Sequence, residues 1–124
     1  MKIVTILGSP RKRGNTAAVL AAFESLVGRQ HEVDRINITD YRVKGCRGCD
    51  HCFSVPDEPG CSQRDDAVRL LKRILAADLV VYASPVYGWS FPAELKALLD
   101  RHYCLVKWRD GEVAASLASG KRAA

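Results

Sequence analysis

A chain of 124 residues with 48% hydrophobic residues has the size and composition of one soluble globular domain, over residues 1–124. Its formal net charge is +5, but 14 acidic residues are interspersed with 19 basic ones, so we expect no nucleic-acid partner. The longest early apolar run, residues 3–7, is too short for a signal peptide or a membrane span, which makes the cytoplasm the expected location.

The first three predicted elements are a strand, a helix and a strand. Residues 2–7 form a short, β-branched apolar run that stops at Gly8, as a buried parallel strand does. The following helix is expected to end at Gly28, and one apolar stripe runs along it, formed by Val19, Leu20, Phe23, Leu26 and Val27. Residues 32–38 alternate moderately between polar and apolar and predict a second strand.

The second half of the chain predicts a helix, a strand and a helix. Ser62 with Asp65 resembles a capping box, and the helix that it opens is expected to face inward with Val68, Leu71 and Leu75. Residues 78–83 form the most hydrophobic strand, and Pro92 opens a last helix with Leu95, Leu98 and Leu99. Strands that alternate with helices predict an α/β fold with a parallel sheet and right-handed crossovers. Ligands of such sheets bind beyond the carboxyl ends of the strands.

The loop after the first strand, residues 8–16, has the chemistry of a phosphate site. Backbone N–H groups at the start of the next helix lack partners, and the helix dipole adds about half a positive charge there. The loop also holds polar donors, basic side chains and two glycines that let the backbone approach a ligand: Ser9, Asn15, Thr16, Arg11, Lys12, Arg13, Gly8 and Gly14. It is neither a Walker A loop nor a G-x-G-x-x-G motif, and a polar turn with incidental arginines is the alternative interpretation.

The loop after the third strand, residues 84–91, carries two aromatic side chains. Tyr87 and Trp89 flank Gly88, and exposed aromatics beside a glycine suit a flat ring system that approaches the backbone. The alternative is that both aromatics cap the sheet. A phosphate at one loop and a planar ring at the other describe FMN.

Three motifs of this sequence resemble those of a known family. They are GSPRKRGNT, the run GCRGCDHC followed by Cys61 and Asp65-Asp66, and ASPVYGWSFPAELKALLDR. Over nearly its whole length the chain resembles the NADPH-dependent FMN reductases and iron–sulfur flavoproteins of the flavodoxin-like superfamily, which implies a doubly wound parallel sheet. The resemblance implies that the FMN phosphate is bound by Ser9, Arg11, Gly14, Asn15 and Thr16. It also implies that the isoalloxazine is lined by Pro85, Val86, Tyr87, Gly88 and Trp89.

The resemblance further implies that bound FMN carries the chemistry. The flavin takes hydride from NAD(P)H and passes hydride or electrons to a small-molecule acceptor such as a free flavin or quinone, so no catalytic side chain is expected. Two other functions stay open at this point. One is an iron–sulfur flavoprotein that carries single electrons between a cluster and the flavin. The other is a non-catalytic flavodoxin-like module that assembles with a partner through an open sheet edge.

Members of this family continue beyond a segment like SGKRAA into a fourth strand, a fifth strand and a final helix. The present sequence stops at Ala124, where the fourth strand is expected to begin, so the expected sheet is truncated after the third strand and its following helix. Either the sequence is part of a longer protein, or a partner subunit supplies the missing layer. We also expect a homo-oligomer.

Four cysteines, Cys46, Cys49, Cys52 and Cys61, follow the spacing C-x2-C-x2-C-x8-C. Two-residue spacings let thiolates converge on one centre, and a fourth thiolate from a nearby loop completes a [4Fe–4S] site. Iron–sulfur flavoproteins bind their cluster in a similar motif, usually with a shorter final gap. Zinc held by the same thiolates, or by three of them with His51, is an alternative, and thiols without metal are another. Cys104 is expected apart from this group as a packing residue, and His102 is expected at the surface.

Overall fold

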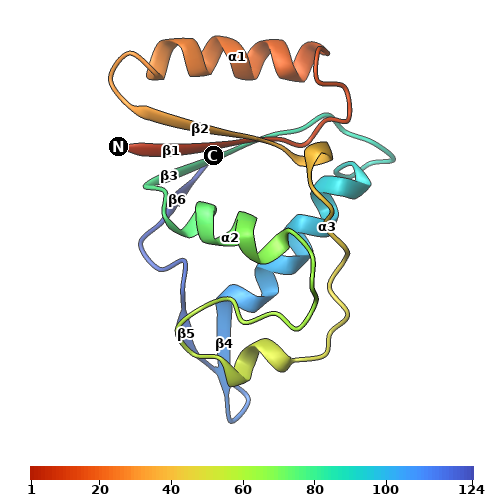
Figure 1. Ribbon diagram of the computed structural model, residues 1–124, viewed down its shortest axis with the longest axis vertical. Coiled ribbons are helices and arrows are strands. Elements are labelled where there is room, and N and C mark those ends of the chain that lie inside the picture. The colour runs from red at the N-terminus through yellow and green to blue at the C-terminus, as the bar shows by residue number, and fades with distance from the viewer.

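Four parallel strands in the order β2-β1-β3-β6 form the centre of the computed structural model, which describes residues 1–124. The strands are β1 (Lys2–Leu7), β2 (Glu32–Asn37), β3 (Leu79–Ala83) and β6 (Arg122–Ala123). Helix α1 (Asn15–Val27) covers one face of the sheet, while α2 (Ala67–Leu75) and α3 (Ala93–Arg101) cover the other (Figure 1). The expected doubly wound α/β sheet is therefore confirmed.

Strand β1 lies between β2 and β3 and is buried on both faces. Ile6, in register with Ile36 and Tyr82, belongs to the core beneath α2 and α3, whereas Leu7 packs against Ala17 of α1. A strand that is covered on both faces is apolar at consecutive positions. For this reason the sequence of β1 lacks the strict alternation of a half-exposed strand.

Helix α1 ends at Gly28 as predicted, but its buried stripe is narrower than expected. Leu20 is 2% exposed, whereas Val19 and Leu26 are 73% and 65% exposed. No second helix packs beside α1 on this face of the sheet (Figure 1). Residues at the flanks of its apolar stripe therefore stay in contact with solvent.

Helix α2 begins at Ala67, five residues after the predicted start at Ser62. Asp65 does not form a capping box with Ser62. Its carboxylate instead accepts hydrogen bonds from the backbone N–H groups of Lys44 at 2.8 Å and Ala67 at 3.1 Å, and it pairs with Arg101. The set that α2 buries also differs from the expected one, since it consists of Ala67, Leu70, Leu71 and Ile74.

Residues 106–116 form a hairpin that was not predicted from the sequence. Strands β4 (Val106–Arg109) and β5 (Glu112–Ser116) pair in antiparallel fashion outside the main sheet, beyond α3 (Figure 1). The chain then returns to the main sheet, where β6 pairs in parallel with β3. The fourth parallel strand thus begins at Arg122, beside β3.

His102, which follows α3, is not the surface residue that we expected. Its Nε2 lies 2.8 Å from the hydroxyl of Tyr82, and its Nδ1 lies 2.9 Å from the carbonyl oxygen of Leu98. Because a carbonyl oxygen only accepts, Nδ1 donates and Nε2 accepts the hydrogen bond from Tyr82. Burial lowers the pKa of His102 and raises the pKa of Tyr82 to about 12.

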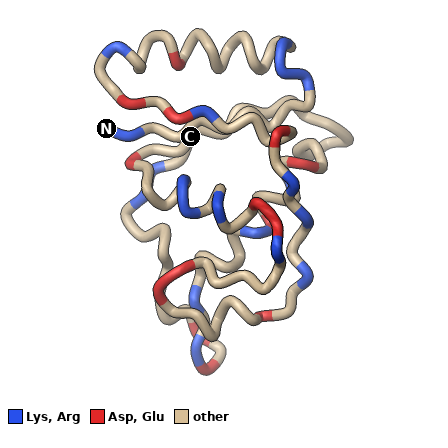
Figure 2. Tube along the Cα trace, in the orientation of Figure 1, with Lys and Arg blue, Asp and Glu red and all other residues tan.

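Acidic and basic segments are interspersed along the chain, with basic residues at the turn into α1 and along α2 (Figure 2). One ion pair, between Arg101 and Asp65, is buried. The other pairs are at least partly exposed. None of the helices combines the length and the apolar character that crossing a bilayer requires.

Candidate functional site

The loops after β1 and β3 meet at the carboxyl end of the sheet (Figure 1). The backbone N–H of Gly8 donates a hydrogen bond of 2.8 Å to the carbonyl oxygen of Ala83, which joins the starts of the two loops. A Cβ at Gly8 would overlap the side chain of Leu95. Glycine therefore lets the first loop leave the sheet in close contact with α3. The two loops that were predicted to converge do so.

The loop between β1 and α1 leads to a helix N-terminus that no side chain caps. Gly14 is the N-cap residue, and the first turn of α1 contains no acidic residue. The hydroxyl of Ser9, which is buried, accepts a hydrogen bond of 3.1 Å from the backbone N–H of Arg11. The first-turn N–H groups of Asn15 and Thr16 have no partner within the chain. An anion is stabilised at such a helix start.

The three basic residues of this loop differ in their surroundings. Lys12 forms an ion pair with Asp40, and this contact lowers the pKa of the Asp40 carboxyl. No carboxylate lies within ion-pair distance of Arg11 or Arg13, and both side chains are exposed. Arg11 and Arg13 are therefore the cations that this loop offers to an anion.

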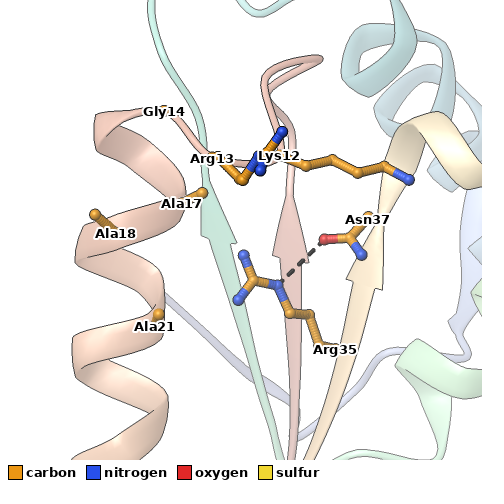
Figure 3. Close-up of a pocket in the computed structure, with 8 residues that line it drawn as sticks. All are labelled: Lys12, Arg13, Gly14, Ala17, Ala18, Ala21, Arg35 and Asn37. Atoms are coloured by element: carbon orange, nitrogen blue, oxygen red, sulfur yellow. Dashed lines mark hydrogen bonds between the residues drawn. The ribbon is translucent and has the colours of Figure 1, made fainter.

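A pocket of about 390 Å³ lies beside this loop, between α1 and the edge strand β2 (Figure 3). Arg35 reaches into it but is held by Glu24 at 3.0 Å and by Asn37 at 3.2 Å, so Arg13 is its one cation without a carboxylate partner. This pocket was not predicted from the sequence, although two polar residues of β2, Arg35 and Asn37, line it. Its lining consists of Lys12, Arg13, Gly14, Ala17, Ala18, Ala21, Arg35 and Asn37.

The loop after β3 closes in a tight turn with exposed aromatic side chains. Tyr87 and Ser90 exchange two backbone hydrogen bonds, of 2.8 and 3.0 Å. Between them Gly88 and Trp89 have φ angles of +52° and +67°, which is the signature of a type I′ turn. Trp89 is 99% exposed and Tyr87 is 42% exposed. Trp89 therefore does not cap the sheet.

The four cysteines of the C-x2-C-x2-C-x8-C motif line one narrow pocket. They lie on the part of the chain that extends beyond α2 and α3, away from the sheet (Figure 1). Cys52 is buried, whereas Cys46 and Cys49 are exposed, and no disulfide joins any of them. In this conformation no three Cys, His, Asp or Glu side chains are close enough to hold a single metal ion.

Cys104 also lines this pocket, so the expectation that it lies apart from the other cysteines is wrong. It is buried in the main core, and burial raises the pKa of its thiol to about 11. The spacing of the cysteines could not show that Cys104 lies beside the other four, because α2, β3 and α3 separate it from Cys61 in the sequence. Its packing role agrees with the expectation.

Arg101, the last residue of α3, lies at the base of the cysteine pocket. Its guanidinium donates to Asp65 at 2.7 Å, to the carbonyl oxygen of Lys44 at 2.8 Å and to the Sγ of Cys61 at 3.1 Å. Burial acts to raise the pKa of Asp65, but hydrogen bonds from Arg101 and two backbone N–H groups lower it below its usual value. The Arg101–Asp65 pair is therefore ionised. One N–H group of Arg101 points at the Sγ of Cys61.

Residues 1–124 match the family described as NADPH-dependent FMN reductase. An iron–sulfur flavoprotein of Archaeoglobus fulgidus is 39% identical over 102 residues, which cover 82% of this chain and 45% of that protein. One from Methanosarcina thermophila is 39% identical over 106 residues, covering 85% and 54%. The chain thus spans about half the length of the curated relatives it matches.

A solved structure supports the fold. The crystal structure of Smu.1420 from Streptococcus mutans matches this chain with a TM-score of 0.73 at 17% sequence identity. The match covers 99% of this chain and 65% of that one. At this level of identity the likeness concerns the arrangement of strands and helices.

Proposed function

The chain belongs to the NADPH-dependent FMN reductase family, and from this premise we propose that it binds FMN and acts as an NAD(P)H-dependent oxidoreductase. Bound FMN supplies the redox chemistry, since it accepts a hydride from NAD(P)H and passes hydride or electrons to a small-molecule acceptor such as a quinone or a free flavin. The part of the protein is to bind and orient the cofactor.

One observation carries this proposal: an uncapped helix start and a loop with exposed aromatics lie together at the carboxyl end of a parallel sheet. We assign the FMN phosphate to the helix start, where Arg11 is an unpaired cation. The Ser9 hydroxyl accepts a hydrogen bond from the chain and still has its own proton to donate to a phosphate oxygen. The proposed phosphate ligands are Ser9, Arg11, Gly14, Asn15 and Thr16.

The flavin ring is assigned to the aromatic loop after β3. Trp89 offers a nearly complete face to solvent, and contact with a flat ring would bury this apolar surface. Gly88 carries no side chain that would keep a ring from the backbone. The proposed ring-lining residues are Pro85, Val86, Tyr87, Gly88 and Trp89.

A second function is favoured by the cysteine pocket. We propose that Cys46, Cys49, Cys52 and Cys61 hold a [4Fe–4S] cluster, so that the protein passes single electrons between cluster and flavin. The number and chemistry of the donors fit this group, because four thiols line one pocket. Cys46 and Cys49 lie on residues 42–50, which have no regular secondary structure. Ligation requires this segment to close over the pocket, because no three donors now converge.

The visible absorption spectrum of the anaerobically purified protein distinguishes these functions. Flavin bands alone support the reductase, and an additional broad brown absorption supports the electron carrier. A protein without any chromophore contradicts both and supports a non-catalytic assembly module.

The iron content of cysteine variants tests the cluster separately. The unmodified chain is expected to contain about four irons, and Cys52→Ser is expected to lose most of them while FMN stays bound. Cys104→Ala is the matched control, since Cys104 lines the pocket but is not a proposed ligand. A zinc site would show one metal and no colour. Loss of FMN together with iron in Cys52→Ser would contradict the separation of the two sites.

A further inference from the structure

Lys107 of β4 is a buried lysine with no carboxylate within ion-pair distance. The residue is 4% exposed, and its Nζ donates to the carbonyl oxygens of Glu58 at 2.8 Å, Cys52 at 3.0 Å and Pro59 at 3.4 Å. Lysine is almost never buried this completely unless it is paired. Three backbone carbonyls satisfy its hydrogen bonds, but they leave a full positive charge inside the fold.

The charged groups around Lys107 are already engaged with each other. The carboxylate of Glu58 pairs with Lys72 at 2.6 Å and is about half exposed. Asp65 pairs with Arg101. Neither carboxylate lies within ion-pair distance of Lys107, so an anion in the neighbouring cysteine pocket would meet an ammonium group that is bonded only to carbonyl oxygens.

The three carbonyls that Lys107 binds belong to the loop between Cys52 and Cys61. Cys52 begins this loop and Pro59 lies near its end, so one ammonium group ties the two ends together. Gly60 has a φ angle of +62°, and a Cβ there would overlap Val55, which shows that the loop folds back on itself. The eight-residue gap is thereby closed, and the thiols at both ends line the same pocket.

We propose that Lys107 is the positioning residue of the iron–sulfur site: it holds the loop that carries Cys52 and Cys61, so that both thiols face one pocket, and it supplies a positive charge beside an anionic tetrathiolate centre. This inference rests on the cluster proposed above. Four thiolates give such a centre a net negative charge in both redox states, and the reduced state carries one electron more. A fixed positive charge beside the site favours the reduced state and so raises the reduction potential. The long final gap of the motif is in this way compatible with a single centre.

The test uses the full chain, purified anaerobically, in three variants with measurements of iron, bound FMN and the one-electron reduction potential. Lys107→Met removes both the loop contacts and the charge, and it is expected to lose about half or more of the iron while FMN is retained. Lys107→Gln keeps an N–H donor without the charge. Lys107→Gln is expected to retain iron. Its equilibrium constant for one-electron reduction of the cluster is expected to be at least tenfold smaller, which lowers the reduction potential by about 59 mV. Arg109→Met removes an exposed cation from the same strand and is expected to change none of the three quantities.

Two results overturn the inference in distinguishable ways. If the unmodified chain holds iron and both Lys107 variants match it in iron content and potential, Lys107 has no such role and the cluster proposal stands. If the unmodified chain binds FMN but no iron, the cluster proposal fails and this inference fails with it. Loss of FMN in Lys107→Met would show that this variant does not fold. In that case the reduction potential of Lys107→Gln tests the inference, and an unchanged potential would contradict it.

Discussion

The Nη2 of Arg101 lies 3.1 Å from the Sγ of Cys61, so the end of α3 contacts the cysteine pocket directly. The same helix begins at Ala93, immediately after the aromatic loop. Nine residues of helix, about 13 Å long, therefore connect the loop assigned to the flavin ring with the pocket assigned to the cluster.

Arg101→Met is expected to lower the free energy of unfolding by about 3–5 kcal/mol, because it leaves Asp65 as a buried, unpaired carboxylate. Denaturant unfolding measures this change. Lys96→Met is the matched control, since it removes the cation of a half-exposed pair with Asp100 on the same helix and is expected to cost less than about 1 kcal/mol. A loss in Arg101→Met no larger than that in Lys96→Met would contradict the expected cost of leaving Asp65 buried without a partner.

Acidification is expected to destabilise the fold through His102. Burial lowers the pKa of this imidazole in the folded state. Its contribution is therefore complete above the unfolded value of about 6.5 and is lost as the pH falls through the lower folded pKa. In that window the unfolded chain binds more protons, so the free energy of unfolding decreases with decreasing pH.

Thermal unfolding between about pH 7.5 and 5.5 measures this effect. The midpoint of the unmodified protein is expected to fall with pH, and His102→Gln is expected to lose part of that dependence. His51→Gln is the control, because His51 is exposed. The same pH dependence in His102→Gln as in the unmodified protein would contradict the role of His102.

Sequence patterns predicted the sheet and the site loops because these depend on local signals. The consecutive apolar residues of β1 and the glycine at each end of the α1 region mark boundaries that tertiary contacts do not override. Asp65 was misassigned because its partner, Arg101, is 36 positions away. The hairpin was missed because every residue of β5 is exposed, so Glu112–Ser116 carries no apolar alternation.

The cysteine pocket also depends on contacts between residues that are far apart in the sequence. Spacing indicated that four cysteines belong together, and all four line one pocket. Lys107, which closes the loop between Cys52 and Cys61, comes from the unpredicted hairpin. Its role could be recognised only once β4 was placed beside that loop.

Replacing both Arg11 and Asn15 with alanine is expected to weaken FMN binding by about tenfold or more, because hydrogen bonds to a charged phosphate are worth about 1.5–3 kcal/mol each. Fluorescence titration with FMN measures this loss. Riboflavin, which lacks the phosphate, should bind both proteins equally. Lys12→Ala is the matched control, since Lys12 pairs with Asp40. Unchanged FMN affinity in the double variant would exclude residues 8–16 as the phosphate site.

Trp89→Ala is expected to change the reduction potential of bound FMN and the rate of NAD(P)H oxidation, with less than about 0.5 kcal/mol effect on stability. The reason is that Trp89 is 99% exposed and contributes almost nothing to the core. Leu95→Ala provides the opposite case, because Leu95 is fully buried and its truncation is expected to cost about 2–5 kcal/mol. A large loss of stability in Trp89→Ala without any effect on flavin would place this side chain outside the flavin site.

Anaerobic titration of the FMN-loaded protein with NADPH tests the central claim most directly, namely that the two loops at the carboxyl end of the sheet hold a flavin that NAD(P)H reduces. Because one hydride carries two electrons, we expect the visible flavin bands to bleach with about one NADPH per bound FMN. The bands are then expected to return when a quinone or free flavin is added. Bound FMN whose visible bands stay unchanged in an excess of NADPH and of NADH would contradict the account.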